Sequence, residues 1–165
     1  MRRLSRQLST IASLAGGVLA LCCLVAADQT ATRIPHRGPV AEKPRALFDR
    51  LKQGFADGRY GPYQLVSSDP KTWTIVVTRN NVDVEHWARW AYCPVSPIDM
   101  IDSLRDGAVR LTVKLEPTTP KITYAVVWAD FTGTYGIAST NKVVQCRSTG
   151  VLEEDVLHVI GATEH

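Results

Sequence analysis

Three aspartates close together in the sequence have the spacing most suggestive of acid–base or metal chemistry. Asp99, Asp102 and Asp106 lie at positions i, i+3 and i+7, so a helix would place them on one face. Carboxylates on one face can exchange protons with a substrate or hold a divalent cation. The same spacing also describes a solvated helix face whose opposite side carries isoleucine and leucine. We favour this second interpretation and predict no metal site.

His86 is the histidine with the most suggestive neighbours, because Asp83 and Glu85 lie beside it. We predict a strand over residues 82–93, although the spacing of its apolar residues also fits a helix. A strand would turn Asp83 and Glu85 to one face and His86 to the other. That separation argues against a shared metal or proton-transfer site, so we interpret His86 as a hydrogen-bonded structural residue.

The sequence contains no GxSxG, glycine-rich phosphate-binding or CxxC motif. Such motifs would indicate a nucleophilic hydrolase, a nucleotide site or a redox dithiol. We therefore expect a protein without a cofactor that acts by binding rather than by catalysis. The alternative is a hydrolase assembled from distant residues that uses Asp99 and Asp102, or His86.

Tryptophan and tyrosine are concentrated in the segments expected to form strands. Trp87 and Trp90 are three residues apart, so a regular strand would turn them to opposite faces. One of the two would then be exposed, as is common for tryptophans that anchor a partner protein. Trp87, Trp90 and Tyr92 therefore form the candidate binding surface.

The N-terminal residues have the pattern of an export signal. Three arginines and no acid precede an uncharged apolar run over residues 11–27, which ends in small residues suited to cleavage. We predict a signal peptide over 1–27, cleavage between Ala27 and Asp28, and a periplasmic or extracellular protein. Two alternatives would anchor the chain to a membrane: retention of the apolar run, which is shorter than the roughly 20 residues of most spanning helices, or acylation at Cys22 or Cys23.

Removal of the signal would change the charge balance. The chain has 19 lysines and arginines against 16 aspartates and glutamates, a net charge of +3. Because three of those arginines and no acid lie in residues 1–27, the remainder is neutral. A neutral domain has no general attraction for nucleic acid or anionic lipid. We therefore expect no nucleic-acid partner, and contact with a membrane only through lipidation or an uncleaved signal.

The alternation of apolar and polar residues predicts an antiparallel sheet, most clearly over 109–116 and 121–131. Further strands are expected over 63–67, 72–79 and 142–147, and helices over 44–56, over 96–105 and after Gly150. We expect a flexible leader over 28–42, followed by one α+β domain over 43–165. Its architecture would be an antiparallel β-meander of about four to five strands packed with an N-terminal and a C-terminal helix.

Two cysteines, Cys93 and Cys146, remain beyond the signal. Cysteine pairs in exported domains usually form a disulfide, and we predict that these two are bonded. The leading hypothesis is thus a non-enzymatic adaptor or inhibitor-type protein of the cell envelope that binds another envelope or secreted protein. The alternative is a carrier of a small apolar ligand, with a pocket between sheet and helix lined by Leu51, Tyr124 and Trp128.

Mass spectrometry of the exported protein tests cleavage and the disulfide together. We expect a chain that starts at Asp28 and is two hydrogens lighter than its reduced form. A chain that retains residues 1–27 would contradict cleavage, and added acyl mass at Cys22 or Cys23 would place the protein on a membrane. Reduction of the denatured protein is the control, because it must restore the two hydrogens.

Overall fold

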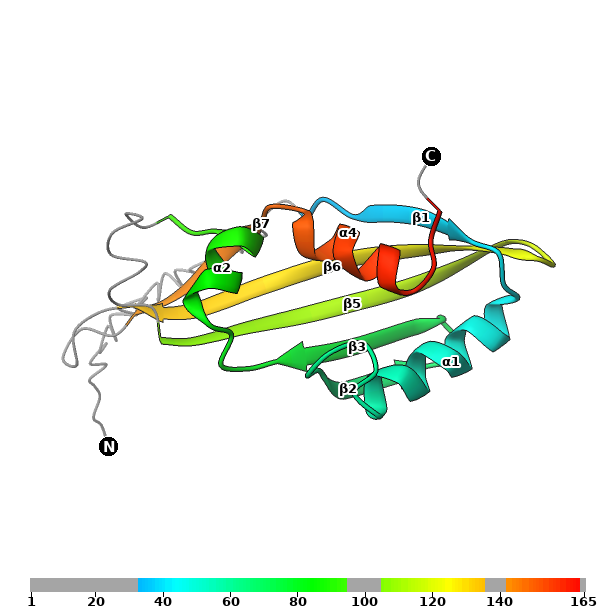
Figure 1. Cartoon of the computed structure of the whole chain (residues 1–165), viewed down its shortest axis with the longest axis horizontal. Helices are drawn as coiled ribbons and strands as arrows, with labels where there is room; N and C mark the ends of the chain where they lie inside the picture. The colour runs from blue at the N-terminus through cyan, green and yellow to red at the C-terminus, as the bar shows by residue number, and fades with distance from the viewer. Residues whose placement is uncertain (1–32, 95–104, 136–141, 164–165) are drawn as a thin grey trace, which may run out of the picture.

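The computed structural model describes residues 33–94, 105–135 and 142–163. These residues form an α+β fold built on an antiparallel sheet (Figure 1). Several residues singled out in the sequence lie outside the described ranges: Cys22, Cys23, Ala27, Asp28, Asp99 and Asp102.

Two long neighbouring strands, β5 (Arg105–Thr119) and β6 (Ile122–Tyr135), form the centre of the sheet. In the described residues the sheet has seven strands in the order β2-β3-β5-β6-β7-β4, and β1 pairs with another part of β6. The shorter strands are β1 (His36–Val40), β2 (Gln64–Asp69), β3 (Thr74–Arg79), β4 (Ala91–Tyr92) and β7 (Lys142–Ser148).

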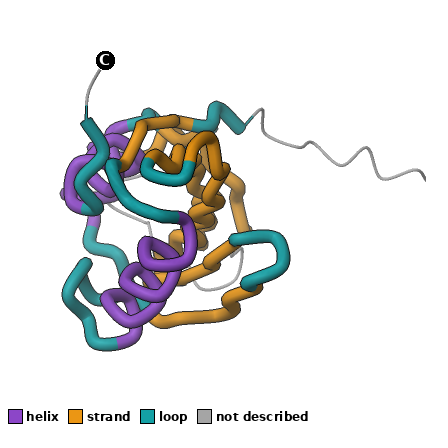
Figure 2. The backbone as a smooth tube through the Cα atoms, turned by 90° about the vertical axis from the view of Figure 1, so that its right-hand side faces the viewer, coloured by secondary structure: helices purple, strands orange, loops and turns teal. Residues whose placement is uncertain are grey.

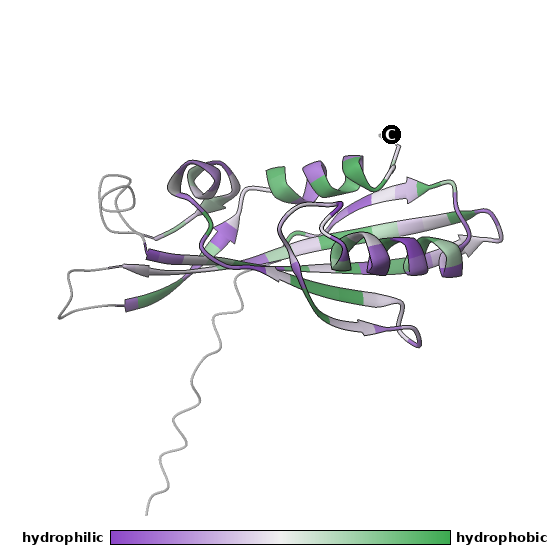
Figure 3. Ribbon diagram, turned by 60° about the horizontal axis from the view of Figure 1, so that its bottom comes forward, coloured by the Kyte–Doolittle hydropathy of each residue, from purple (hydrophilic) through white to green (hydrophobic). Residues whose placement is uncertain are grey.

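Within the described ranges, three helices pack on one face of this sheet: α1 (Pro44–Ala56), α2 (Val84–Trp90) and α4 (Val151–Val159). Figures 2 and 3 show the helices on the same side of the strands. Helix α1 begins at Pro44, whose missing N–H costs nothing in a first turn. Its apolar residues recur at helical spacing, so that Leu51 and Phe55 are fully buried in the core.

The side chains of β6 alternate between the two faces of the sheet, as a strand requires. Val127 and Phe131 point toward the helices and are buried, and the ring of Phe131 lies 5.5 Å from that of Trp87 on α2. Tyr124 and Trp128 lie on the opposite face and are half-buried. The alternation therefore separates a core face under the helices from a face that no described helix covers.

The part of the chain that the structure describes has seven strands instead of the expected four to five, and one of the additional strands lies in the predicted leader. Residues 36–40 form β1, which pairs in register with residues 123–127 of β6. Because β7 pairs only with residues 131–135 of β6, the first half of that edge needs another partner for its backbone groups. The leader prediction is therefore wrong over 36–40, where Pro39 is tolerated because β1 is an edge strand.

The predicted strand over 82–93 is also wrong for most of its length. Residues 84–90 form α2, and only Ala91–Tyr92 form a strand. The Asp83 carboxylate accepts a hydrogen bond from the His86 backbone N–H and so caps the helix. A second difference follows at residues 105 and 106, which belong to β5 rather than to the end of a helix.

Between β1 and β7, a side chain rather than a strand completes the β6 edge. The backbone N–H of Ala129 donates a 3.0 Å hydrogen bond to Glu153 Oε1 of α4, and Ser148 Oγ donates one of 2.8 Å to Glu153 Oε2. The Glu153 side chain is buried. This carboxylate therefore takes the place of a strand partner and fixes α4 over the sheet.

Replacing Glu153 with alanine tests this contact. We expect E153A to lower the free energy of unfolding by about 1–3 kcal/mol, because it leaves a buried N–H without an acceptor. The matched control is E154A, a change at an exposed neighbour on the same helix, which should cost less than about 0.5 kcal/mol. Urea unfolding monitored by circular dichroism measures both, and equal losses would contradict the assigned role.

Candidate functional site

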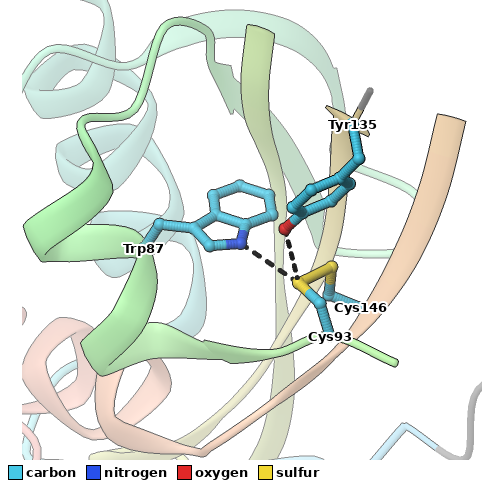
Figure 4. Close-up of a disulfide and its surroundings, with 4 residues drawn as sticks. All are labelled: Trp87, Cys93, Tyr135 and Cys146. Atoms are coloured by element: carbon cyan, nitrogen blue, oxygen red, sulfur yellow. Dashed lines mark hydrogen bonds between the residues drawn. A yellow bond between two sulfur atoms is a disulfide. The ribbon is translucent and has the colours of Figure 1, made fainter. Parts of the chain in front are cut away.

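The predicted disulfide between Cys93 and Cys146 is present and joins the segment after β4 to β7. Figure 4 shows Trp87 and Tyr135 directed at it. The Trp87 indole N–H lies 3.2 Å, and the Tyr135 hydroxyl 3.1 Å, from Cys93 Sγ. Both sulfurs are buried, so the bridge and its two donors form a structural cluster that fixes the end of α2 against the sheet.

The three residues of the candidate binding surface differ in exposure, because residues 84–90 form helix α2. Trp87 is fully buried and Trp90 is 6% exposed, because residues three apart share one face of a helix. Tyr92 is 72% exposed and pairs in β4 with Arg147 of β7. The structure therefore does not bring the three aromatic side chains together on one surface.

Asp83 and His86 lie together, whereas the predicted strand would have separated them. A carboxylate oxygen of Asp83 lies 2.6 Å from His86 Nδ1. Hydrogen bonds from the backbone N–H and side chain of His86 lower the pKa of Asp83. The His86 ring also packs at a tilt against that of Trp90, with ring centroids 5.0 Å apart. Asp83 caps α2 through the His86 backbone N–H, and His86 is hydrogen-bonded as expected from the sequence.

Two other arrangements considered from the sequence are not formed by the described residues. They are the aspartates on one helix face and the apolar pocket between sheet and helix. Asp106 lies exposed in β5 with a φ of 49°, so it is not on a helix face with other aspartates. Leu51 is buried under α1 on the core face, whereas Tyr124 and Trp128 lie on the opposite face of the sheet. These three residues therefore do not line one pocket, because the sheet lies between them.

A groove on the helical side is the site that the sequence did not reveal. We call it the Trp90 groove, and its volume is about 170 Å³. Residues 60–63, Arg79 and Trp90 form one part of its lining. One side of α4 and the residue that follows it form the other: Leu152, Asp155, Val156, Val159 and Ile160. No periodicity links segments so far apart in the chain, which is why the sequence could not predict it.

The turn at residues 60–63 is held by contacts to α1. Tyr60 and Tyr63 pack edge-on against Phe55, with ring centroids 5.1 and 5.9 Å apart. Arg50 donates one hydrogen bond to the Tyr60 hydroxyl and another to the backbone carbonyl of Ile160, which follows α4. These contacts couple two sides of the Trp90 groove, so its shape is set before any ligand arrives.

Trp90 and Arg79, which both line the Trp90 groove, carry polar groups. The Trp90 indole N–H is buried and has no hydrogen-bond acceptor among the described residues. An unpaired buried donor costs about 1–3 kcal/mol. The Arg79 guanidinium lies over the Trp90 ring, 5.4 Å from its centroid, and its closest carboxylate oxygen is that of Asp83 at 3.8 Å. An apolar groove with a few convergent polar groups is the usual form of a binding site.

A second hollow, of about 410 Å³, lies between β1 and α4 and is lined by His36, Glu154 and His158 among others. His36 Nδ1 lies 3.5 Å from Glu154 Oε1. Within the described ranges, no three histidine, cysteine or acidic side chains are arranged to hold a metal ion. The lining of this hollow is more polar than that of the Trp90 groove, and water can meet the hydrogen-bonding needs of such a lining.

No protein-family model, curated protein or solved structure matches this chain. In the part of the chain that the structure describes, no helix has the length and apolar character needed to cross a membrane.

The ionisation of Tyr63, which lines the Trp90 groove, tests whether its side chain is buried there. Burial raises the pKa of Tyr63 to about 12, against a smaller lowering by Arg79. An unfolded chain releases this proton near pH 10, so the stabilisation is complete below pH 10 and is lost as the pH rises toward 12. Between pH 8 and 11 we expect the wild type to lose about 1 kcal/mol more unfolding free energy than Y63F. Urea unfolding at each pH measures both proteins. Equal losses of unfolding free energy in the wild type and Y63F would contradict the burial of Tyr63.

Proposed function

We propose that this protein is an exported, non-enzymatic binding protein of the cell envelope, and that it holds an apolar side chain of a partner protein in the Trp90 groove. The observation that carries the proposal is a hollow whose lining is mostly aromatic and aliphatic, with Val159 of α4 left 55% exposed beside it.

The size of the Trp90 groove suits one side chain. An apolar cavity of roughly 150 Å³ can hold benzene, and the Trp90 groove has about 170 Å³. Val159 at its rim is 55% exposed, so an incoming apolar group would cover surface that water now contacts. A single anchoring side chain in a preformed hollow is the arrangement expected of an interface hot spot.

The disulfide supports the proposal that the protein is exported. A buried disulfide is compatible with an exported protein, because cytosolic proteins are mostly kept reduced. In such a compartment, a partner protein from the envelope or the extracellular space is the accessible binding target. The alternative role as a carrier of a small apolar ligand has no support from its expected pocket, because the sheet separates Leu51 from Tyr124 and Trp128.

Selection of peptides from a displayed random library on the immobilised protein tests the proposal. We expect selected peptides to share an apolar residue and to bind V159D at least about tenfold more weakly, since a buried carboxylate would oppose apolar burial. The matched control is V143D, because Val143 is 77% exposed on the sheet face away from the helices. Peptides that bind V159D as well as the wild type would overturn this location of the site.

A further inference from the structure

We propose that the face of the sheet opposite the helices docks on an anionic phospholipid membrane. We call it the open sheet face, because no described helix covers it. It comprises the side chains of β6 that share a side with Trp128, and the residues paired with them on neighbouring strands. The Trp90 groove lies on the helical side, so a protein docked in this way keeps that groove free for a partner protein. Membrane docking therefore goes beyond the proposed function.

The register of the strands identifies the side chains on the open sheet face. Residues directly opposite each other on neighbouring strands point to the same side, and successive residues of a strand alternate. Arg110 of β5 is opposite Asp130 of β6. In β7, Cys146 is buried on the core side, so the next residue, Arg147, points to the open sheet face. Tyr92 of β4 is opposite Arg147 and shares that side.

An excess of positive charge distinguishes the open sheet face. Three acidic side chains there, Asp69, Glu116 and Asp130, stand against six basic ones: Arg33, Arg37, Arg105, Arg110, Lys114 and Arg147. The net charge of this set is +3, and it is +2 if Asp106 at the irregularity in β5 is counted with it. Residues 28–165 are neutral as a whole. That neutrality, from which we expected no attraction to anionic lipid, therefore conceals a basic face.

Two arginines of this face are available to a ligand. Arg110 and Arg147 are exposed, and neither forms an ion pair with another residue of the described ranges. The Asp130 carboxylate on the strand between them is instead held by Arg33, at 2.7 and 3.0 Å. Arginine donates to phosphate oxygens in a bidentate manner. The two guanidinium groups can therefore bind phosphates outside the protein.

Exposed apolar side chains beside these arginines favour a membrane over a soluble polyanion. Tyr92 is 72% exposed next to Arg147, and Val143 is 77% exposed on the same side of β7. Trp128 is half-buried two residues from Asp130. A bilayer surface offers phosphates to arginine, an interface that suits tyrosine and tryptophan, and an acyl boundary for valine. An acidic polymer in water offers the charge alone and leaves Val143 without an apolar partner.

Sedimentation of the protein, as its own cell exports it, with phospholipid vesicles tests the docking. The probes are vesicles of equal parts phosphatidylglycerol and phosphatidylcholine, and vesicles of phosphatidylcholine alone. We expect binding to the anionic vesicles to be at least about tenfold stronger than to the neutral ones. Sodium chloride at about 1 M, where the screening length is about 3 Å, should release most of the bound protein. Equal binding to both kinds of vesicle, unchanged by salt, would overturn the proposal.

A pair of double variants locates the binding face. We expect R110Q/R147Q to weaken binding to the anionic vesicles at least about tenfold, because one basic side chain contributes about fivefold at such a surface. The matched control is R45Q/K52Q, which removes the same charge from exposed positions of α1 on the helical side. Equal losses in the two double variants would mean a general attraction of the domain, and the assignment to this face would be overturned.

A pair of valine variants tests the apolar part of the contact. We expect V143S to weaken vesicle binding about threefold, because a smaller apolar side chain would leave water. V159S is its control, because Val159 is similarly exposed but lies at the Trp90 groove. If soluble polyglutamate binds as tightly as the vesicles and with the same dependence on Arg110 and Arg147, the ligand is an acidic polymer and membrane docking is overturned. None of these outcomes decides the proposed function, which the Val159-dependent peptide selection tests separately.

Discussion

The backbone requirement of β6 is the constraint on which the rest of the structure depends. One edge of this strand is paired along its whole length by β5, but the other edge exceeds the length of any single neighbour. It is divided between β1 at residues 123–127 and β7 at residues 131–135. The buried Glu153 carboxylate accepts from Ala129 in the interval. Each of these partners comes from a different part of the chain, so satisfying one edge brings both ends of the domain together.

The same requirement positions the candidate site. Because Glu153 must reach β6, α4 lies across the sheet and presents Val156 and Val159 to the Trp90 groove. At the other side, the Trp87 N–H contacts Cys93 of the disulfide and holds α2 against β7. Trp90 then lies one turn further along α2. The walls of the groove are thus positioned by two buried polar contacts whose residues do not line it.

Local sequence patterns predicted the elements whose apolar residues follow a single clear periodicity. Strict alternation identified β5 and β6, and the spacing of Leu47, Leu51 and Phe55 identified α1. Residues 82–93 were harder, because their tryptophans fit both periods and the choice is made by an Asp83 cap and by packing against Phe131. Residues 36–40 read as polar and irregular, yet they pair because β6 offers unpaired backbone groups. The disulfide followed from counting cysteines, whereas the Trp90 groove depends on distant segments that no local rule connects.

Trp90 also shows why packing alone does not account for the site. A phenylalanine at this position would fill much of the same core and would leave no buried donor without an acceptor. The indole adds an unpaired N–H at about 1–3 kcal/mol, a large share of the 5–15 kcal/mol by which domains are usually stable. Stacking with Arg79 offsets part of this cost, since tryptophan is the best ring for a cation. Trp90 therefore combines the burial of a large ring with an N–H that the described residues leave unpaired, and the Arg79 cation lies over the ring rather than at that N–H.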